Sequence, residues 1–173
     1  MIPAMELRDG ELVLRPLGLD DLDAVVDSCR DPEIPRFTLL VPSPYTEADG
    51  REFLTSVEEA WREGGSERTF AMTAGGEFLG VVGVGLDTGV LGYWTRREAR
   101  NRGWTTRAVV TVVEWARQQG LRHLSLTTHP DNLASQRVAL KAGFREVGLV
   151  DEPRGFRDGT RKAVLFELGD EAA

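Results

Sequence analysis

Residues Thr95 to Arg107 read TRREARNRGWTTR and form the most informative segment of the sequence. It carries five arginines against one glutamate, Glu98, and it joins a strand-like run to a helical pattern that starts near Thr105. The start of a helix exposes unpaired N–H groups and a partial positive charge, so sequences usually place acidic side chains there. A bound anion such as a pyrophosphate would resolve this conflict, with Gly103 allowing the backbone to approach it. A solvated, charged loop is the alternative interpretation.

Outside this stretch, the hydrophobic pattern changes its period along the chain. Helical spacing recurs over residues 20–29, 46–63, 105–119 and 133–142, with a capping-box pattern at Thr46 to Asp49. Strand-like runs occupy residues 11–16, 69–74, 78–84, 90–95, 123–128, 144–148 and 163–168. A polar loop broken by prolines covers Pro32 to Tyr45. This order of elements predicts an α+β fold with a mixed sheet.

Composition narrows the class of protein further. The chain has 173 residues, with 21 Lys and Arg against 28 Asp and Glu and a net charge of −7, and we expect one domain over residues 1–173. The acidic balance disfavours a DNA or RNA coat. One cysteine, Cys29, and two histidines leave no internal disulfide and no zinc ligand set, so we expect no metal. No signal peptide and no membrane-spanning segment are evident, which predicts a cytoplasmic protein.

Two motifs resemble those of the GNAT family of N-acetyltransferases. Arg100 to Thr105, RNRGWT, resembles the acetyl-CoA-binding signature Q/R-x-x-G-x-G/A, with Thr105 in place of the final Gly or Ala and Asn101 where many relatives have Gly. Further along, Asp131 to Ser135 and Leu140 to Phe144 are similar to the family's N-x-x-S helix and K-x-G-F turn. The two motifs follow each other in the family's order. More loosely, the chain resembles the RimJ/RimL-type branch, which acetylates ribosomal-protein N-termini.

The resemblance implies a fold and a donor substrate. The fold would be a GNAT-like acyl-CoA N-acyltransferase fold, with a central, mixed, mostly antiparallel seven-stranded sheet, splayed central strands and about four flanking helices. The strands that end near Thr95 and Thr128 would separate, so that the pantetheine arm of acetyl-CoA pairs with them like an extra strand. The implied donor-binding residues are Tyr93, Trp94, Thr95, Arg100, Asn101, Arg102, Gly103, Trp104, Thr105, Thr106, Asn132 and Ser135.

Catalytic roles also follow from the resemblance. Ser135 would donate a hydrogen bond to the leaving sulfur, and Asn132 would position the pantetheine or a water; without the family, a helix cap and an ordinary first-turn serine would explain both. A protonated amine must lose a proton before it attacks, and His129 has a suitable intrinsic pKa. Water is the other candidate for this base, and a structural histidine is the simpler interpretation of His129. Glu98 could instead orient the amine or form a salt bridge with a neighbouring arginine.

The acceptor is the least determined part of the hypothesis. Phe37, Tyr45, Trp94 and Glu98 are candidate acceptor-binding residues, because two lie in the long loop and two follow or end the central strand. A protein N-terminal amine is the first acceptor expected and a small-molecule amine the second, each attacking directly in a ternary complex. An inactive sensor of acyl-CoA is the alternative function. A homodimer is a further expectation.

Overall fold

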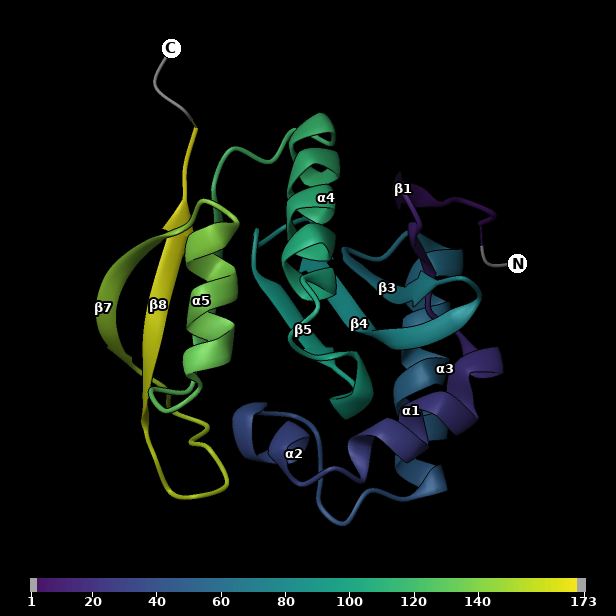
Figure 1. Cartoon of the computed structure of the whole chain (residues 1–173), viewed down its shortest axis with the longest axis horizontal. Coiled ribbons are helices and arrows are strands. Elements are labelled where there is room, and N and C mark those ends of the chain that lie inside the picture. The colour runs from purple at the N-terminus through teal and green to yellow at the C-terminus, as the bar shows by residue number, and fades with distance from the viewer. Residues whose placement is uncertain (1–2, 171–173) are drawn as a thin grey trace.

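The computed structural model describes residues 3–170 (Figure 1). The strands are β1 (Leu7–Asp9), β2 (Leu12–Pro16), β3 (Glu67–Ala74), β4 (Glu77–Gly85), β5 (Leu91–Thr95), β6 (Leu124–Thr128), β7 (Arg145–Asp151) and β8 (Lys162–Leu168). The helices are α1 (Leu22–Cys29), α2 (Glu33–Phe37), α3 (Glu47–Glu63), α4 (Trp104–Gln118) and α5 (Leu133–Lys141), with short 3-10 turns at Leu19–Asp21 and Arg97–Ala99. None of the helices in this range is long and apolar enough to cross a membrane.

The strands form two antiparallel sheets rather than one. The first has five strands in the order β1-β2-β3-β4-β5, and the second has three in the order β6-β8-β7. The α+β class is confirmed, whereas the expected single sheet of seven strands is corrected to eight strands in two sheets. The strand that was not expected is β1. It is only three residues long, which is too short for an alternation of apolar and polar residues to indicate a strand. Within residues 3–170, the one isolated bridge, Val90 to Ser125, is the only parallel pairing.

Local signals in the sequence explain where the long helices begin and end. The expected capping box is confirmed, because the Thr46 side chain accepts from the Asp49 N–H and Asp49 accepts from the Thr46 N–H. Helix α3 ends at Gly64, which adopts the left-handed conformation. Helix α4 buries Val109, Val112 and neighbouring apolar residues. The short helix α2 is a fifth helix inside the segment expected to be an irregular loop.

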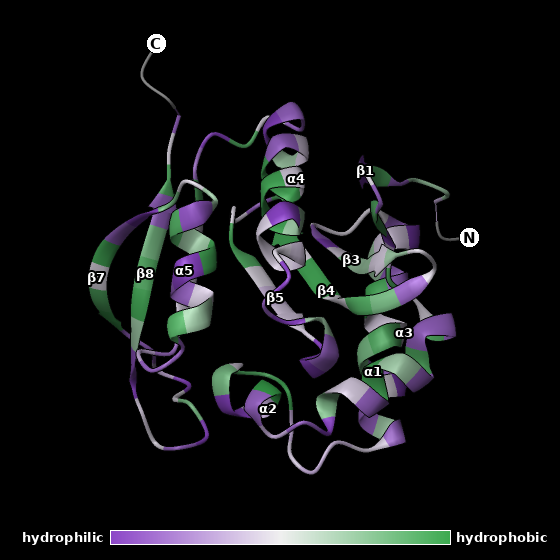
Figure 2. Cartoon of the chain, in the orientation of Figure 1, coloured by the Kyte–Doolittle hydropathy of each residue, from purple (hydrophilic) through white to green (hydrophobic). Residues whose placement is uncertain are grey.

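The core lies between the five-stranded sheet and the helices that cover it. Helices α1 and α3 pack on β4 and β3, while α4 packs on β1, β2 and β4. The run of buried residues from Phe78 to Val82 in β4 requires apolar cover on both faces of the sheet. Phe70 is fully buried, and its ring meets Trp61 of α3 and Trp115 of α4 edge-on. Figure 2 shows the hydrophobic colouring along much of β4 and on one side of the long helices.

The two sheets are joined at one end only. The Ser125 N–H donates to the Gly89 carbonyl over 2.9 Å, next to the Val90–Ser125 bridge. Beyond this point β5 continues in one sheet while β6 pairs with β8. The main chains of β5 and β6 are therefore joined only near the first residues of the two strands. Their carboxyl ends, at Thr95 and Thr128, belong to different sheets. This is the separation of central strands that the sequence motifs imply.

A glycine makes the junction possible, and its replacement tests the arrangement. Gly89 has φ +70°, and a Cβ there would lie 2.2 Å from the His123 carbonyl oxygen. We predict that Gly89→Ala lowers the free energy of unfolding by roughly 3 kcal/mol, because backbone must move. The matched control is Gly75→Ala, at φ +58° in open space, which should cost only about 1 kcal/mol. Equal losses in urea unfolding would contradict the close approach at Gly89.

Candidate functional site

The loop before α4 presents a row of main-chain donors. Asn101 and Gly103 adopt left-handed conformations, with φ 61° and 81°, and α4 begins at the next residue. Between residues 3 and 170, no group accepts a hydrogen bond from the N–H groups of residues 101–106. The first turn of α4 contains no acidic residue. Free N–H groups, the positive end of the helix dipole and the lack of a carboxylate in the first turn of α4 make this segment chemically suited to an anion.

The arginines of this stretch are less available than the sequence suggests. Arg100 donates to the Thr95 carbonyl over 3.0 Å and forms ion pairs with Asp31 at 2.8 Å and Glu33 at 3.0 Å. These bonds hold the loop against α2 and the end of α1. The Arg100 guanidinium therefore has a structural role. It would support an anion site only indirectly, by holding the backbone of the loop in place.

Two more arginines are paired with acids far away in the sequence. Arg96 lies 3.1 Å from Asp27, and Arg107 lies 2.8 Å from Asp9, with its guanidinium over the Trp104 ring. Of the five arginines in this stretch, only Arg97 and Arg102 have no ion pair within the described range. Both are exposed.

Thr105, the departure from the family signature, points into the protein. Its hydroxyl lies 2.5 Å from the Thr95 hydroxyl at the end of β5. The larger side chain therefore ties the first turn of α4 to the central strand. Thr106 is half-buried in the same turn.

Helix α5 brings Asn132 and Ser135 to the other side of the separated strands. The Asn132 Oδ1 accepts from the Ser135 N–H over 3.2 Å, so Asn132 caps the helix. The Ser135 Oγ lies 2.9 Å from the Tyr93 hydroxyl, which also donates to the Ser135 carbonyl over 3.1 Å. Burial raises the pKa of Tyr93 to about 12, so its hydroxyl stays protonated. The Tyr93 side chain is a bridge between β5 and α5 that the sequence motifs did not indicate.

The alternation of side chains along β5 separates two faces. Tyr93 and Thr95 reach α5 and the first turn of α4 on one face. Trp94 points to the opposite face, where its ring lies 6.0 Å from that of Phe78. One face of β5 therefore carries the Tyr93 and Thr95 hydroxyl groups, and the opposite face carries the Trp94 ring beside Phe78.

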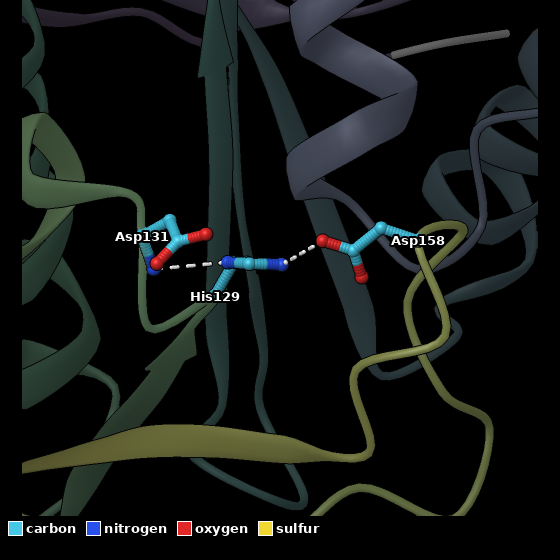
Figure 3. A group of neighbouring side chains, drawn as sticks. All are labelled: His129, Asp131 and Asp158. Carbon is cyan, nitrogen blue, oxygen red and sulfur yellow. Dashed lines mark hydrogen bonds and ion pairs between the residues drawn. The ribbon is translucent and has the colours of Figure 1, made fainter.

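His129 lies at the end of β6 with both ring nitrogens engaged (Figure 3). The side chain is 1% exposed; Nδ1 accepts from the Asp131 N–H over 2.9 Å, and Nε2 lies 2.7 Å from an Asp158 carboxylate oxygen. Because Nδ1 accepts, the proton sits on Nε2 and is donated to Asp158. Hydrogen bonds from Thr160, and then the bond from His129, lower the pKa of Asp158 to about 2. The ring offers no free lone pair to an amine in this arrangement.

The same three side chains form a compact group of potential metal ligands. Each of His129, Asp131 and Asp158 offers one ligand atom, and these three atoms lie within 4.8 Å of one another. Residues 3–170 contain no other group of this kind. The hydrogen bonds on both ring nitrogens account for their closeness.

The candidate acceptor residues do not gather in one place. Phe37 meets the His129 ring edge-on at 5.2 Å. Tyr45 is 7% exposed and packs in the core beside Gly50, and burial raises its pKa. Glu98 is exposed and pairs with Arg96 at 3.2 Å. A main-chain hydrogen bond is the larger cause that lowers the pKa of Glu98, and the interaction with Arg96 is a smaller cause in the same direction. The structure thus brings Phe37 to the end of β6 and places Tyr45 in the core.

Comparison with known proteins identifies relatives over most of the chain. The family model described as "Acetyltransferase (GNAT) domain" matches residues 11–145. An aminoglycoside N(6′)-acetyltransferase type 1 from Serratia marcescens is 44% identical over 55 residues, which span 32% of this chain and 38% of that relative.

Solved structures share the fold at low sequence identity. A ribosomal-protein-serine acetyltransferase from Vibrio cholerae superposes with a TM-score of 0.80 at 18% identity, covering 98% of this chain and 99% of that one. RimJ from Mycobacterium smegmatis, in complex with a CoA disulfide, gives 0.82 at 20% identity, covering 95% and 86%. RimL in complex with coenzyme A gives 0.84 at 14% identity, covering 98% and 100%. The family model covers well over half of the chain, and we conclude that this protein belongs to the GNAT family of acetyltransferases.

Proposed function

We propose that the chain, as one domain over residues 1–173, transfers an acetyl group from acetyl-CoA to the N-terminal amine of a protein. The observation that carries the proposal is the row of free N–H groups at residues 101–106, which opens beside the separated ends of β5 and β6. The length-wide fold similarity to ribosomal-protein acetyltransferases favours a protein acceptor. The 55-residue match to an aminoglycoside acetyltransferase supports a small-molecule amine as the second candidate.

The donor would lie along β5 and the start of α4. The main-chain N–H groups of residues 101–106 would bind the pyrophosphate, assisted by the Arg102 side chain. The backbone of Tyr93 to Thr95 would pair with the pantetheine arm, since no strand among residues 3–170 pairs with that side of β5 near its carboxyl end. Acetyl-CoA supplies the acetyl group as a reactive thioester. The main chain near Trp94 would polarise the carbonyl to be attacked.

Ser135 and Tyr93 would supply a proton donor at the leaving group. Tyr93 has one hydroxyl proton and two acceptors, the Ser135 carbonyl and the Ser135 Oγ. When the Tyr93 hydroxyl donates to the Ser135 carbonyl, the Ser135 hydroxyl can donate to the Tyr93 oxygen. When the Tyr93 hydroxyl donates to the Ser135 Oγ, the Ser135 proton is free to be donated to the sulfur. Both hydroxyl groups are in place, which favours an enzyme over an inactive sensor. Proton removal from the amine is assigned to water, because both nitrogens of His129 are occupied.

The acceptor class can be settled by measuring free thiol released from acetyl-CoA. The purified protein is assayed with peptides that begin with Ser, Thr or Ala, with the same peptides blocked at the N-terminus, and with aminoglycosides and polyamines. We predict release with free N-terminal peptides and none with the blocked forms. Turnover of aminoglycosides alone would favour the second acceptor. Tight acetyl-CoA binding without release for any amine would establish the sensor.

The donor site predicts an order of effects on acetyl-CoA affinity. Gly103→Ala should raise the dissociation constant about tenfold or more, because a side chain at φ 81° distorts the loop. Arg102→Ala should raise it about fivefold, as one exposed charge is lost. Arg97→Ala, which removes the other unpaired arginine, is the matched control and should leave it within about twofold. Calorimetric titration checks the order, and equal effects for all three would contradict a backbone site.

The hydroxyl pair predicts a loss in turnover without a loss in donor binding. Ser135→Ala should lower kcat about 30-fold, and Tyr93→Phe about fivefold, because Tyr93 acts through Ser135. The double variant should be no slower than Ser135→Ala alone, since the relay needs both groups. Acetyl-CoA affinity should stay within about twofold in all three. An unchanged kcat for Ser135→Ala would remove this residue from the mechanism.

A further inference from the structure

Three segments that are distant in sequence meet around the His129 ring. The ring belongs to the turn between β6 and α5. It lies edge-on to Phe37 of α2 at 5.2 Å and edge-on to Phe156, from the β7–β8 loop (residues 152–161), at 4.7 Å. Its Nε2–H donates to Asp158 of the same loop. A 1% exposed imidazole therefore joins α2 and the β7–β8 loop to the carboxyl end of β6.

Contacts next to the ring bring the same segments together. The Arg36 guanidinium of α2 lies 3.6 Å from the carboxylate of Asp131, the residue whose N–H donates to the ring. Arg157 of the β7–β8 loop donates to the Val41 carbonyl over 3.3 Å, which links that loop directly to the segment after α2. In Figure 1 α2 and the β7–β8 connection lie below the carboxyl end of β5. Helix α2, the segment after it and the β7–β8 loop thus form one continuous wall beside the carboxyl end of β6.

This wall lies apart from the groups assigned to the donor. The Tyr93 and Ser135 hydroxyl groups are on the α4 and α5 side of β5, together with the free N–H groups of residues 101–106. Trp94 points to the other face of β5. An amine has to approach the acetyl group from outside the donor's own path. The wall contains none of the groups assigned to the donor, and its link to the donor-binding loop is the Glu33–Arg100 ion pair of α2.

We propose that His129 is a positioning residue, which holds the β7–β8 loop and α2 against β6 and so fixes the wall on which the amine acceptor docks. The proposal rests on the proposed transfer to an amine and names the part of the chain that binds it. The ring acts through its two hydrogen bonds and its two aromatic contacts. A general base would instead need one ring nitrogen free and facing the amine.

The test compares substitutions on both sides of the hydrogen bond. Asp158→Ala keeps the imidazole and removes its partner, and we expect the KM for the amine to rise about tenfold with kcat nearly unchanged, the size expected when one charge-assisted hydrogen bond is lost. His129→Phe keeps the aromatic packing but loses the same hydrogen bond, so its KM for the amine should equal the raised KM of Asp158→Ala. Asp158→Asn retains an oxygen that can accept from Nε2–H and should restore the KM to within about threefold. The KM for acetyl-CoA should not change in any of them.

A carboxylate at the base of the same loop provides the control. Asp151 pairs with Lys162 across β7 and β8 and does not contact His129. Asp151→Ala should leave the KM for the amine within about twofold. The pH profile of kcat should keep its shape in Asp158→Ala and His129→Phe. A large fall in kcat in His129→Phe, with loss of the limb of the pH profile that a base produces, would overturn the proposal.

Hydrogen–deuterium exchange separates this proposal from the proposed function. In Asp158→Ala, the amides of residues 152–161 and of residues 33–44 should both exchange faster than in the unsubstituted protein. Unchanged exchange would overturn the positioning role, and faster exchange with an unchanged amine KM would overturn the acceptor wall. If the unsubstituted protein acetylates no amine at all, the proposed function fails, while exchange still decides whether His129 holds the two loops.

Discussion

The structure depends on the single point at which β5 and β6 touch. The two strands meet at the Val90–Ser125 bridge, where a Cβ on Gly89 would collide with backbone, and then enter different sheets. Ordinary pairing along the full length of both strands would satisfy their backbone groups and leave no gap. The separation instead leaves one side of β5 free near its carboxyl end. The free N–H groups of residues 101–106 and the Tyr93–Ser135 hydroxyl pair lie beside this part of β5, and the proposed acceptor wall lies beside the carboxyl end of β6.

Electrostatics adapts an acidic protein to a negatively charged donor. The net charge of −7 argues against a broad polyanion-binding surface, and three of the five arginines between residues 96 and 107 form ion pairs with acids that are distant in sequence. What remains positive is small: the free N–H groups of residues 101–106, the end of the α4 dipole and the exposed Arg97 and Arg102. Such a site suits one pyrophosphate. The ion pairs of Arg100 serve to hold the loop in the shape that presents these donors.

Local sequence signals predicted most of the fold, whereas long-range contacts had to come from the structure. Capping at Thr46, the end of α3 at Gly64 and the start of α4 after Gly103 depend on neighbouring residues and were all predictable. The Arg100–Asp31 ion pair and the His129–Asp158 hydrogen bond join segments that are far apart in the sequence. No pattern of hydrophobic residues indicates that such segments lie side by side. The side chain of Tyr93 was missed for the same reason, although its place on the face of Thr95 was a usable clue. For His129, the base hypothesis rested on an intrinsic pKa, which says nothing about which nitrogens are already bonded.

If main-chain N–H groups at the start of α4 bind the donor, acetyl-CoA must perturb these amides before all others. Titration of the ¹⁵N-labelled protein with acetyl-CoA, followed through its amide resonances, measures this perturbation. We expect the largest shifts at residues 101–106, accompanied by shifts at Tyr93 to Thr95 and around Ser135. Shifts confined to other parts of the chain, or the absence of any shift at saturating acetyl-CoA, would contradict donor binding at these amides.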